Sequence, residues 1–356
     1  MTSILISAIL AANFGSGDAD VGADVGADVG ADVGADVGAD VGAEMRDCRH
    51  HTTTSLAMSD IKTVAVAGAS GTLGPHIMSA LLQANFQVTV LTRSKKSALY
   101  DPSVKVLEVD FTSIKSLTSA LHAQDAVVST VSAAAVEGQR VLIDAAVSAG
   151  VKRFIPSDFG SCTTSPKVKE LPVYAPMANI QQYLADRAAT TKLSFTVLAC
   201  GAFLDIVLSA PVLLDFDSYK AVLVDDGNNR LSSTSMASVG RAVAGILKNP
   251  ESTSNRTVRV SQVILTQNKL LEIAKEIKSE ATWDISTVTS AAILQESLQE
   301  FASGDVGMPV IIKLLRATAF GGEQYGSAYD ETDNEILDIA TVTESELKKL
   351  VAERLS

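Results

Sequence analysis

Residues 62–82 combine an apolar run, a glycine-rich turn and an apolar-spaced segment, and this order constrains the fold more than any other feature. The run at 62–67 has the composition of a buried strand, and residues 75–82 have the apolar spacing of a helix. Glycines between a strand and a helix let the backbone turn tightly and approach a diphosphate at the helix N-terminus. The turn reads G-x-x-G-x-x-G, and a tight turn without a ligand is the alternative. We expect a dinucleotide to bind here to Gly68, Ala69, Ser70, Gly71, Thr72, Leu73 and Gly74.

Strand and helix patterns alternate along the rest of the first half of the chain. Helical patterns at 113–122 and 139–146 separate runs of strand composition, which lie at 87–92, 104–109, 125–130, 153–156 and 195–200. Strands separated by helices pair in parallel through right-handed crossovers. The sequence therefore predicts an α/β fold with a Rossmann-like, doubly wound parallel sheet.

The end of the second predicted strand indicates which dinucleotide binds. A protein that prefers NAD carries an acidic residue there for the ribose hydroxyls, whereas an Arg favours the 2′-phosphate of NADP. Arg93 occupies this place, and Lys96 follows it. Ligands of such sheets bind beyond the strand C-termini, where Thr130 and Ser157 also lie. We expect NADPH as the cofactor, with an ordinary solvated Arg93 as the alternative.

The N-terminal 57 residues differ from the rest of the chain. Residues 20–43 are the tetrapeptide Asp-Val-Gly-Ala written six times, and a period of four matches neither helix nor strand. The known glycine-aspartate calcium repeat has nine residues, so a calcium site is disfavoured. We interpret residues 1–57 as a low-complexity, disordered extension, or as sequence upstream of the true start at Met58.

Composition excludes several classes of function. The net charge of −12 disfavours nucleic-acid binding, which needs a basic surface. Cys48, Cys162 and Cys200 form no C-x-x-C pair, which argues against both a zinc site and a disulfide framework. No apolar run is long enough to span a membrane. We expect no metal site, a cytoplasmic location, a small-molecule substrate and a monomer or homodimer.

Residues 152–160 read K-R-F-I-P-S-D-F-G, and this segment resembles a known family. It is similar to the R-F-x-P-S-E-F-G motif of the isoflavone reductase-like branch of the NmrA-type atypical short-chain dehydrogenases, with Asp158 in place of Glu. Segments that extend the resemblance, with a fungal character, are 171–174, 202–205, 238–243, 255–256, 265–268 and 333–335.

The resemblance implies a division of the chain into three parts. Residues 1–57 are the extension, 58–200 an NADP-binding Rossmann domain, and 201–356 a smaller substrate-binding lobe with some return of chain to the Rossmann sheet. It implies that Phe159 contacts both cofactor and substrate, and that Tyr174 and Met177 contact substrate. It also implies that Trp283 and residues 308–320 line or cover the pocket. From the residues alone, we expect a helix over 266–280 and a hairpin turn at 225–229.

The catalytic residue cannot be assigned from the sequence. Ordinary short-chain dehydrogenases use Y-x-x-x-K, but Ala178 lies four residues after Tyr174, and Arg187 four after Tyr183. The resembling reductases use a Lys within L-P-V-F-x-x-K, and Met177 stands at that position. Methionine neither donates nor usefully accepts a proton.

Three interpretations of Met177 remain open. The substrate can supply its own acid, another group such as Tyr174, Lys167 or Lys169 can substitute, or the protein can bind NADP(H) without turnover. The resemblance favours an NADPH-dependent reductase that transfers hydride to a small aromatic or polyketide-like substrate in secondary metabolism. The alternative is a non-catalytic, NADP(H)-binding regulatory or auxiliary protein.

Overall fold

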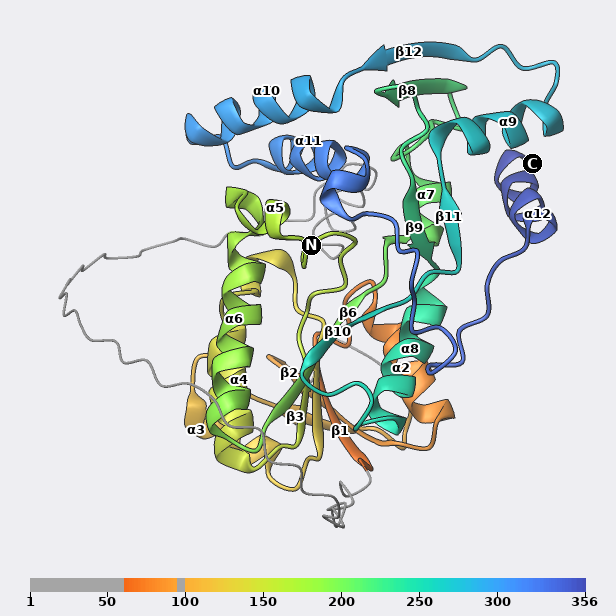
Figure 1. The fold of residues 1–356 in the computed structure, drawn as a ribbon. Helices are drawn as coiled ribbons and strands as arrows, with labels where there is room; N and C mark the ends of the chain where they lie inside the picture. The colour runs from red at the N-terminus through yellow and green to blue at the C-terminus, as the bar shows by residue number, and fades with distance from the viewer. Residues whose placement is uncertain (1–60, 95–99) are drawn as a thin grey trace, which may run out of the picture.

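A parallel sheet of seven strands organises the chain (Figure 1). The computed structural model describes residues 61–94 and 100–356, so the repeat tract and Lys96 lie outside the described residues. The strand order is β10-β6-β5-β4-β1-β2-β3. The strands are β1 (Thr63–Ala67), β2 (Gln87–Thr92), β3 (Lys105–Glu108), β4 (Ala126–Ser129), β5 (Arg153–Ile155), β6 (Ser194–Ala199) and β10 (Arg256–Arg259). The predicted doubly wound parallel sheet is confirmed.

Helices cover both faces of this sheet, and each face has its own apolar core. α2 (Gly74–Gln83) and α8 (Met236–Lys248) pack on the face that carries Val66 and Val128. α3 (Ile114–Leu121), α4 (Gln139–Ala149) and α6 (Ala175–Thr190) pack on the face of Val127 and Phe154. Side chains alternate between the faces of a strand, so strands buried on both sides read as continuous apolar runs.

The seventh strand, β10, was not located from the sequence, although the resemblance implies that part of 201–356 returns to the sheet. The four residues of β10 are polar enough to resemble a loop. The buried guanidinium of Arg153 connects the loop before β10 to the sheet. Arg153 Nε donates to Ser194 Oγ at 2.8 Å, and Nη1 donates to Thr196 Oγ1 and Thr253 Oγ1 at 2.7 and 3.0 Å. Nη2 donates to the carbonyl of Pro250 at 2.5 Å. A side chain of β5 therefore binds both β6 and the loop that leads into β10.

The remaining chain forms two small sheets with their own helices. The sheets are β11-β9-β7 and β12-β8, built from β7 (Ala202–Phe203), β8 (Lys220–Val224), β9 (Leu231–Thr234), β11 (Val263–Leu265) and β12 (Asp284–Val288). The helices are α7 (Leu204–Ser209), α9 (Gln267–Ile277), α10 (Ser290–Ala302), α11 (Met308–Ala319) and α12 (Glu344–Leu355). Shorter turns of helix are η2 (Ala133–Ala135), α5 (Pro166–Lys169), η3 (Pro172–Tyr174) and η4 (Glu323–Tyr325).

One expectation for this region was wrong and one is confirmed. The turn at 225–229 is not a hairpin, because β8 pairs with β12 and β9 pairs with β11 and β7. Trp283 is buried with Phe216 and Tyr219 in an apolar cluster that also contains Ala317 and Phe320. That Trp283 and residues 308–320 line or cover a pocket stays a prediction. The predicted helix after residue 266 is α9, and Thr266 Oγ1 caps it by accepting from the amide of Lys269.

Candidate cofactor and substrate site

The glycine turn after β1 lies so close to neighbouring backbone that side chains would not fit at two of its positions. Gly68 has a φ of +86°, and a Cβ there would lie 2.6 Å from the carbonyl oxygen of Thr130. A Cβ on Gly74 would lie 2.3 Å from the carbonyl oxygen of Ala69. Both distances are far below van der Waals contact. These two glycines are required by the fold itself, and they bring the turn against the end of β4.

The same turn leaves hydrogen-bond donors without acceptors at the N-terminus of α2. The amides of Gly71 and Gly74 donate within the turn, but no acceptor within residues 61–94 and 100–356 receives the amides of Thr72 or Leu73. The helix has no side-chain cap, and Pro75 stands in its first turn. Ser70 and Gly71 are exposed. Unpaired amides at a helix N-terminus attract an anion, so the turn fits a phosphate group.

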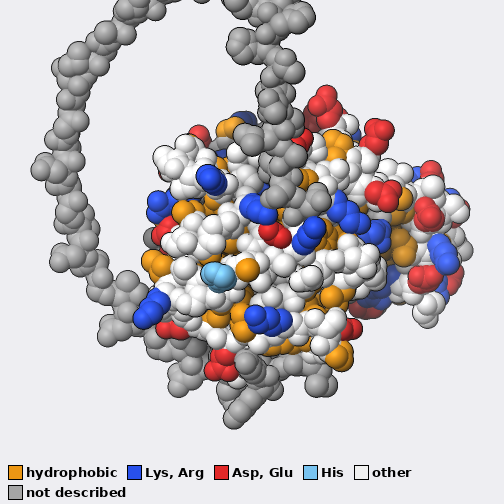
Figure 2. Space-filling model, turned by 90° about the horizontal axis from the view of Figure 1, so that it is seen from below, with side chains coloured by type: hydrophobic (Ala, Val, Ile, Leu, Met, Phe, Trp, Pro, Cys, Tyr) orange, Lys and Arg blue, Asp and Glu red, His pale blue; other side chains and the backbone are white. Residues whose placement is uncertain are grey.

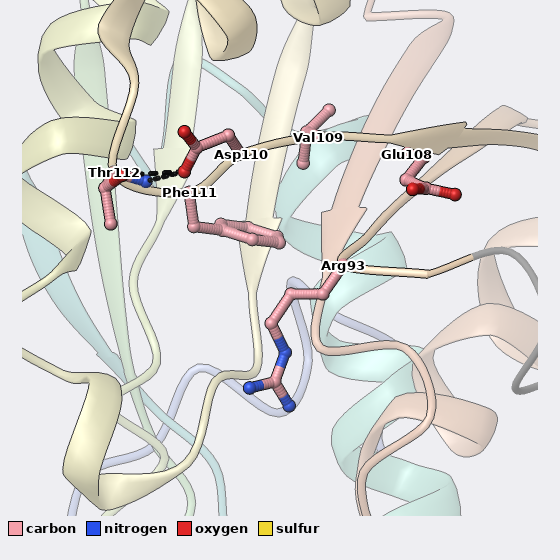
Figure 3. Close-up of a pocket in the computed structure, with 6 residues that line it drawn as sticks. All are labelled: Arg93, Glu108, Val109, Asp110, Phe111 and Thr112. Atoms are coloured by element: carbon pink, nitrogen blue, oxygen red, sulfur yellow. Dashed lines mark hydrogen bonds between the residues drawn. The ribbon is translucent and has the colours of Figure 1, made fainter. Parts of the chain in front are cut away.

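A pocket of about 510 Å³ lies at the ends of β2 and β3 (Figure 3). Arg93, on the residue after β2, lines it together with residues 108–112 from the end of β3. Arg93 is exposed, and its guanidinium takes part in none of the ion pairs found among the described residues. Figure 3 shows the Arg93 and Glu108 side chains pointing in different directions. The guanidinium is thus available to an anionic group of a ligand.

Asp110 supplies an acceptor on the other side of this pocket. The amide and the hydroxyl of Thr112 donate to Asp110 Oδ1 at 2.9 and 2.7 Å. These bonds from Thr112 hold the pKa of Asp110 below its ordinary value, so the group is a carboxylate at neutral pH. Phe111, which is half-buried, presents an aromatic surface beside it. Together they offer an apolar face and an acceptor, the two features that an adenine base needs.

Thr130 and Ser157 lie at the same edge of the sheet, but both hydroxyl protons are already used. Thr130 Oγ1 donates to the carbonyl of Ala67 at 3.0 Å, and Ser157 Oγ donates to the carbonyl of Val131 at 2.8 Å. Both residues are buried. Toward a ligand they can offer lone pairs and backbone groups, not a hydroxyl proton.

The loop after β5 is held from several directions. The Asp158 amide donates back to the carbonyl of Pro156 at 2.8 Å, which makes a tight turn around Ser157. Asp158 Oδ1 accepts from Thr163 Oγ1 at 2.7 Å, and Oδ2 accepts from Gln181 Nε2 at 2.6 Å. Phe159 is buried in the core shared by α2 and α8.

Tyr174 and Met177 are close to one another, and both are buried beneath α11. Each side chain is 2% exposed, and both belong to the apolar cluster that contains Leu314 of α11. Tyr174 Oη and Thr318 Oγ1 form a hydrogen bond of 2.5 Å, and Cys162 Sγ lies 3.8 Å from the phenol oxygen. Burial, together with Cys162, raises the pKa of Tyr174 well above that of an exposed phenol. The Met177 side chain is therefore almost completely closed to solvent.

Comparisons with known proteins show the family of this chain. A profile of the NmrA-like family matches residues 60–353. The chain belongs to the NmrA-like family. The oxidoreductase aprR of Aspergillus flavus is 32% identical over 282 residues, which cover 78% of this chain and 94% of that protein.

Solved structures share the fold of this NmrA-like protein. An isoflavone reductase has a TM-score of 0.65 at 22% identity and covers 82% of this chain and 98% of its own. The structure of AtPrR2 with NADP+ and (+)-pinoresinol has the same TM-score and identity and covers 83% of this chain and 99% of its own. The resemblance to isoflavone reductase-like members of the family is confirmed.

The candidates for a substitute acid in this NmrA-like protein differ in their surroundings. Lys167 and Lys169 are exposed on α5, and Lys167 Nζ donates to Gln324 at 3.4 Å. Tyr174 lies in the same buried cluster as Met177, but its hydroxyl is hydrogen-bonded to Thr318. The geometry therefore offers no lysine in the place that the family pattern gives to one.

Sequence patterns did not indicate several residues that shape the site. Thr318, Gln139 and Gln181 lie far along the chain from the groups that they contact, and no local motif marks them.

Among the described residues, no three His, Cys, Asp or Glu side chains gather as metal ligands, and no helix could cross a membrane. Figure 2 shows basic, acidic and apolar side chains interspersed on the described part of the face seen from below.

Proposed function

We propose that this NmrA-like protein is an NADPH-dependent reductase that transfers hydride to a small aromatic or polyketide-like substrate in secondary metabolism. The observation that carries the proposal is the pairing of two anion-binding features at one sheet edge. The unpaired amides at the start of α2 suit a diphosphate, and the Arg93 pocket suits a 2′-phosphate.

The proposed cofactor contacts divide into two halves. The turn from Gly68 to Gly74 holds the diphosphate, while Arg93, with Asp110 and Phe111, holds the adenosine 2′-phosphate. The nicotinamide half would lie beside the residues that follow β4 and β5. These are Thr130 after β4, and Ser157 and Phe159 after β5. AtPrR2, which shares this fold, has been solved with NADP+ and (+)-pinoresinol, and this supports both the cofactor and an aromatic substrate.

The proposed substrate region is apolar. Val173, Tyr174, Met177 and Leu314 belong to one buried cluster, and α11 covers them. Apolar walls exclude water from a hydride acceptor and favour a flat aromatic ligand. The 58–200 segment would then bind the cofactor, and the 201–356 segment would supply the cover.

NADPH, when bound, supplies the hydride. The chain contributes binding, orientation and exclusion of water, because Met177 cannot move a proton. Hydride transfer to a quinone gives the phenolate of a hydroquinone, and hydride transfer to an enone gives an enolate. Both anions are less basic than the alkoxide formed from a ketone, so they need less help from an acid and can take their proton from water afterwards. Such substrates are the ones that these residues fit best.

A second candidate function is NADP(H) binding without turnover. Met177 in place of the family's lysine, buried under α11, is the observation that favours it. In that case α11 would stay closed, and the cofactor would act as a signal for a partner.

Titration and turnover separate these functions. The full chain is titrated by calorimetry with NADPH and NADH, and oxidation of NADPH is then followed with quinones, enones and aryl ketones. We expect NADPH to bind at least about tenfold more tightly than NADH, and to be oxidised with a quinone or an enone. Binding without oxidation across the whole set would support the second function, and failure to bind either cofactor would refute both.

A further inference from the structure

Two glutamines on neighbouring helices bind consecutive residues of the loop after β5. Gln139, the first residue of α4, accepts a hydrogen bond from the Ser157 amide on Oε1 at 2.8 Å. Gln181 of α6 donates from Nε2 to Asp158 Oδ2 at 2.6 Å. All four residues are buried. The backbone of the loop at Ser157 is thus hydrogen-bonded to α4, and the side chain of Asp158 is hydrogen-bonded to α6.

The orientation of the Gln139 amide follows from chemistry. A backbone amide can only donate, so the atom facing Ser157 must be the oxygen, and Nε2 must point elsewhere. That Nε2 is buried and has no acceptor among the described residues. Gln139 is 2% exposed, and a leucine at this buried position would leave no donor unpaired. Its hydrogen bond to Ser157 is the one contribution that a leucine could not make.

The Gln181 contact has an equally specific geometry. Gln181 Nε2 also lies 3.4 Å from the carbonyl of Thr163, whose hydroxyl donates to the same Asp158 carboxylate. A Cβ on Gly160 would lie 2.6 Å from Thr163 Cγ2, so the loop closes on itself between Asp158 and Thr163. Gln181 therefore sets where the Asp158 carboxylate and the backbone beside it lie.

The loop occupies the place where open sheets of this kind bind ligands. It follows β5, which pairs with β4, and β4 pairs with β1, at the point where the strand order reverses. We propose that Gln139 and Gln181 are positioning residues that fix Ser157 and Asp158 for the nicotinamide half of the cofactor, without touching it. This inference rests on the proposed binding of NADPH.

A comparison of two ligands tests the inference. NADPH and adenosine 2′,5′-bisphosphate are titrated into the full chain by calorimetry, because the second ligand contains the adenine half alone. Gln139→Leu and Gln181→Leu should each weaken NADPH about tenfold and leave the bisphosphate unchanged. Gln139→Glu retains an acceptor oxygen at the helix N-terminus and should bind NADPH within about threefold of the native chain.

Gln182 provides the matched control. It neighbours Gln181 on α6 but is exposed and bonds Asp186 of its own helix, so Gln182→Leu should bind both ligands as the native chain does. Should a leucine variant fail to fold, the asparagine variant at the same position replaces it. Its side chain is one methylene shorter, so its amide cannot reach the loop, and we expect the same change in binding. Folded variants that bind NADPH normally, or lose both ligands equally, would overturn the inference. A native chain that binds neither ligand would instead refute the proposed function.

Discussion

At the scale of single residues, Arg93 and Met177 differ in exposure, and this difference decides what each of them can do. Arg93 is exposed at the mouth of a pocket, where its charge can act on a ligand. Met177 is buried among apolar side chains, where a charge could not be accommodated. The first therefore predicts a preference between cofactors, and the second predicts the effect of restoring the family's lysine.

Replacing Arg93 should change cofactor preference. Arg93→Ala should weaken NADPH by about 2 kcal/mol, the usual contribution of a charge-assisted hydrogen bond, and leave NADH nearly unchanged. Dissociation constants from calorimetry measure this. Arg230→Ala, which removes a distant arginine paired with Asp330, is the control. Equal losses for both cofactors would contradict the assignment of Arg93 to the 2′-phosphate.

Placing a lysine at position 177 should destabilise the protein. Met177→Lys would bury an ammonium without a partner, and an uncompensated buried charge costs about 3–5 kcal/mol. Met177→Leu, which keeps the apolar volume, should cost less than about 1.5 kcal/mol. Urea unfolding measures both. A lysine variant as stable as the native chain would show that α11 opens readily and lets solvent reach this position.

At the scale of elements, the ends of the central strands are held by ionic hydrogen bonds. Asp125, just before β4, accepts from the amides of Lys62 and Thr63 at 2.9 and 3.0 Å and from Lys152 Nζ at 2.6 Å. The Thr63 hydroxyl also donates to Asp125, at 3.1 Å. Partial burial alone would raise the pKa of Asp125, but these four bonds outweigh it and hold the pKa at about 2. The carboxylate thereby joins β1, β4 and β5.

This lowered pKa predicts a dependence of stability on pH. Because the folded pKa is below the unfolded value of about 3.9, the contribution is complete above that value and is lost as pH falls toward 2. Asp125→Asn should therefore destabilise the protein by about 2 kcal/mol at pH 7 and by little near pH 2. Asp284→Asn, on the exposed strand β12, should change stability by less than about 0.5 kcal/mol at either pH. A pH-independent loss in Asp125→Asn would refute the ionic explanation.

At the scale of the whole molecule, α11 covers the buried cluster around Met177. The bond between Tyr174 and Thr318 joins η3 to α11 across 144 residues of sequence. Ser327 Oγ donates to the carbonyl of the same Thr318, and Ser327 accepts from the amide of Ser232. The position of α11 is therefore connected to both the Rossmann side and β9.

Removing the Thr318 hydroxyl should loosen this cover. Thr318→Val leaves the buried phenol of Tyr174 without its oxygen partner, which costs about 1–3 kcal/mol. We expect faster proteolysis in the connection between α10 and α11, and a lower melting temperature. Thr341→Val, at an exposed position, serves as the control. Unchanged proteolysis of the Thr318 variant would show that the hydroxyl does not hold α11 in place.

The sequence by itself determined the sheet strands up to β6, the glycine turn and the position of Arg93. These depend on residues adjacent in the chain: apolar runs, a strand-glycine-helix order and the end of a strand. The sequence did not locate β10, since its residues are polar and the loop before it is held by Arg153 from another strand. Nor did it indicate that β8 and β9 belong to different sheets.

Only the tertiary structure decided what surrounds Met177 and Ser157. Sequence spacing marked Met177 as the family's lysine position, but its burial depends on α11, more than a hundred residues further along the chain. In the same way, Gln139 and Gln181 contact residues 18 and 23 positions away, and helical periodicity marks them only as part of a helix. A local pattern reports which element a residue joins. Contacts between elements depend on how those elements pack, and packing is decided by the whole chain at once.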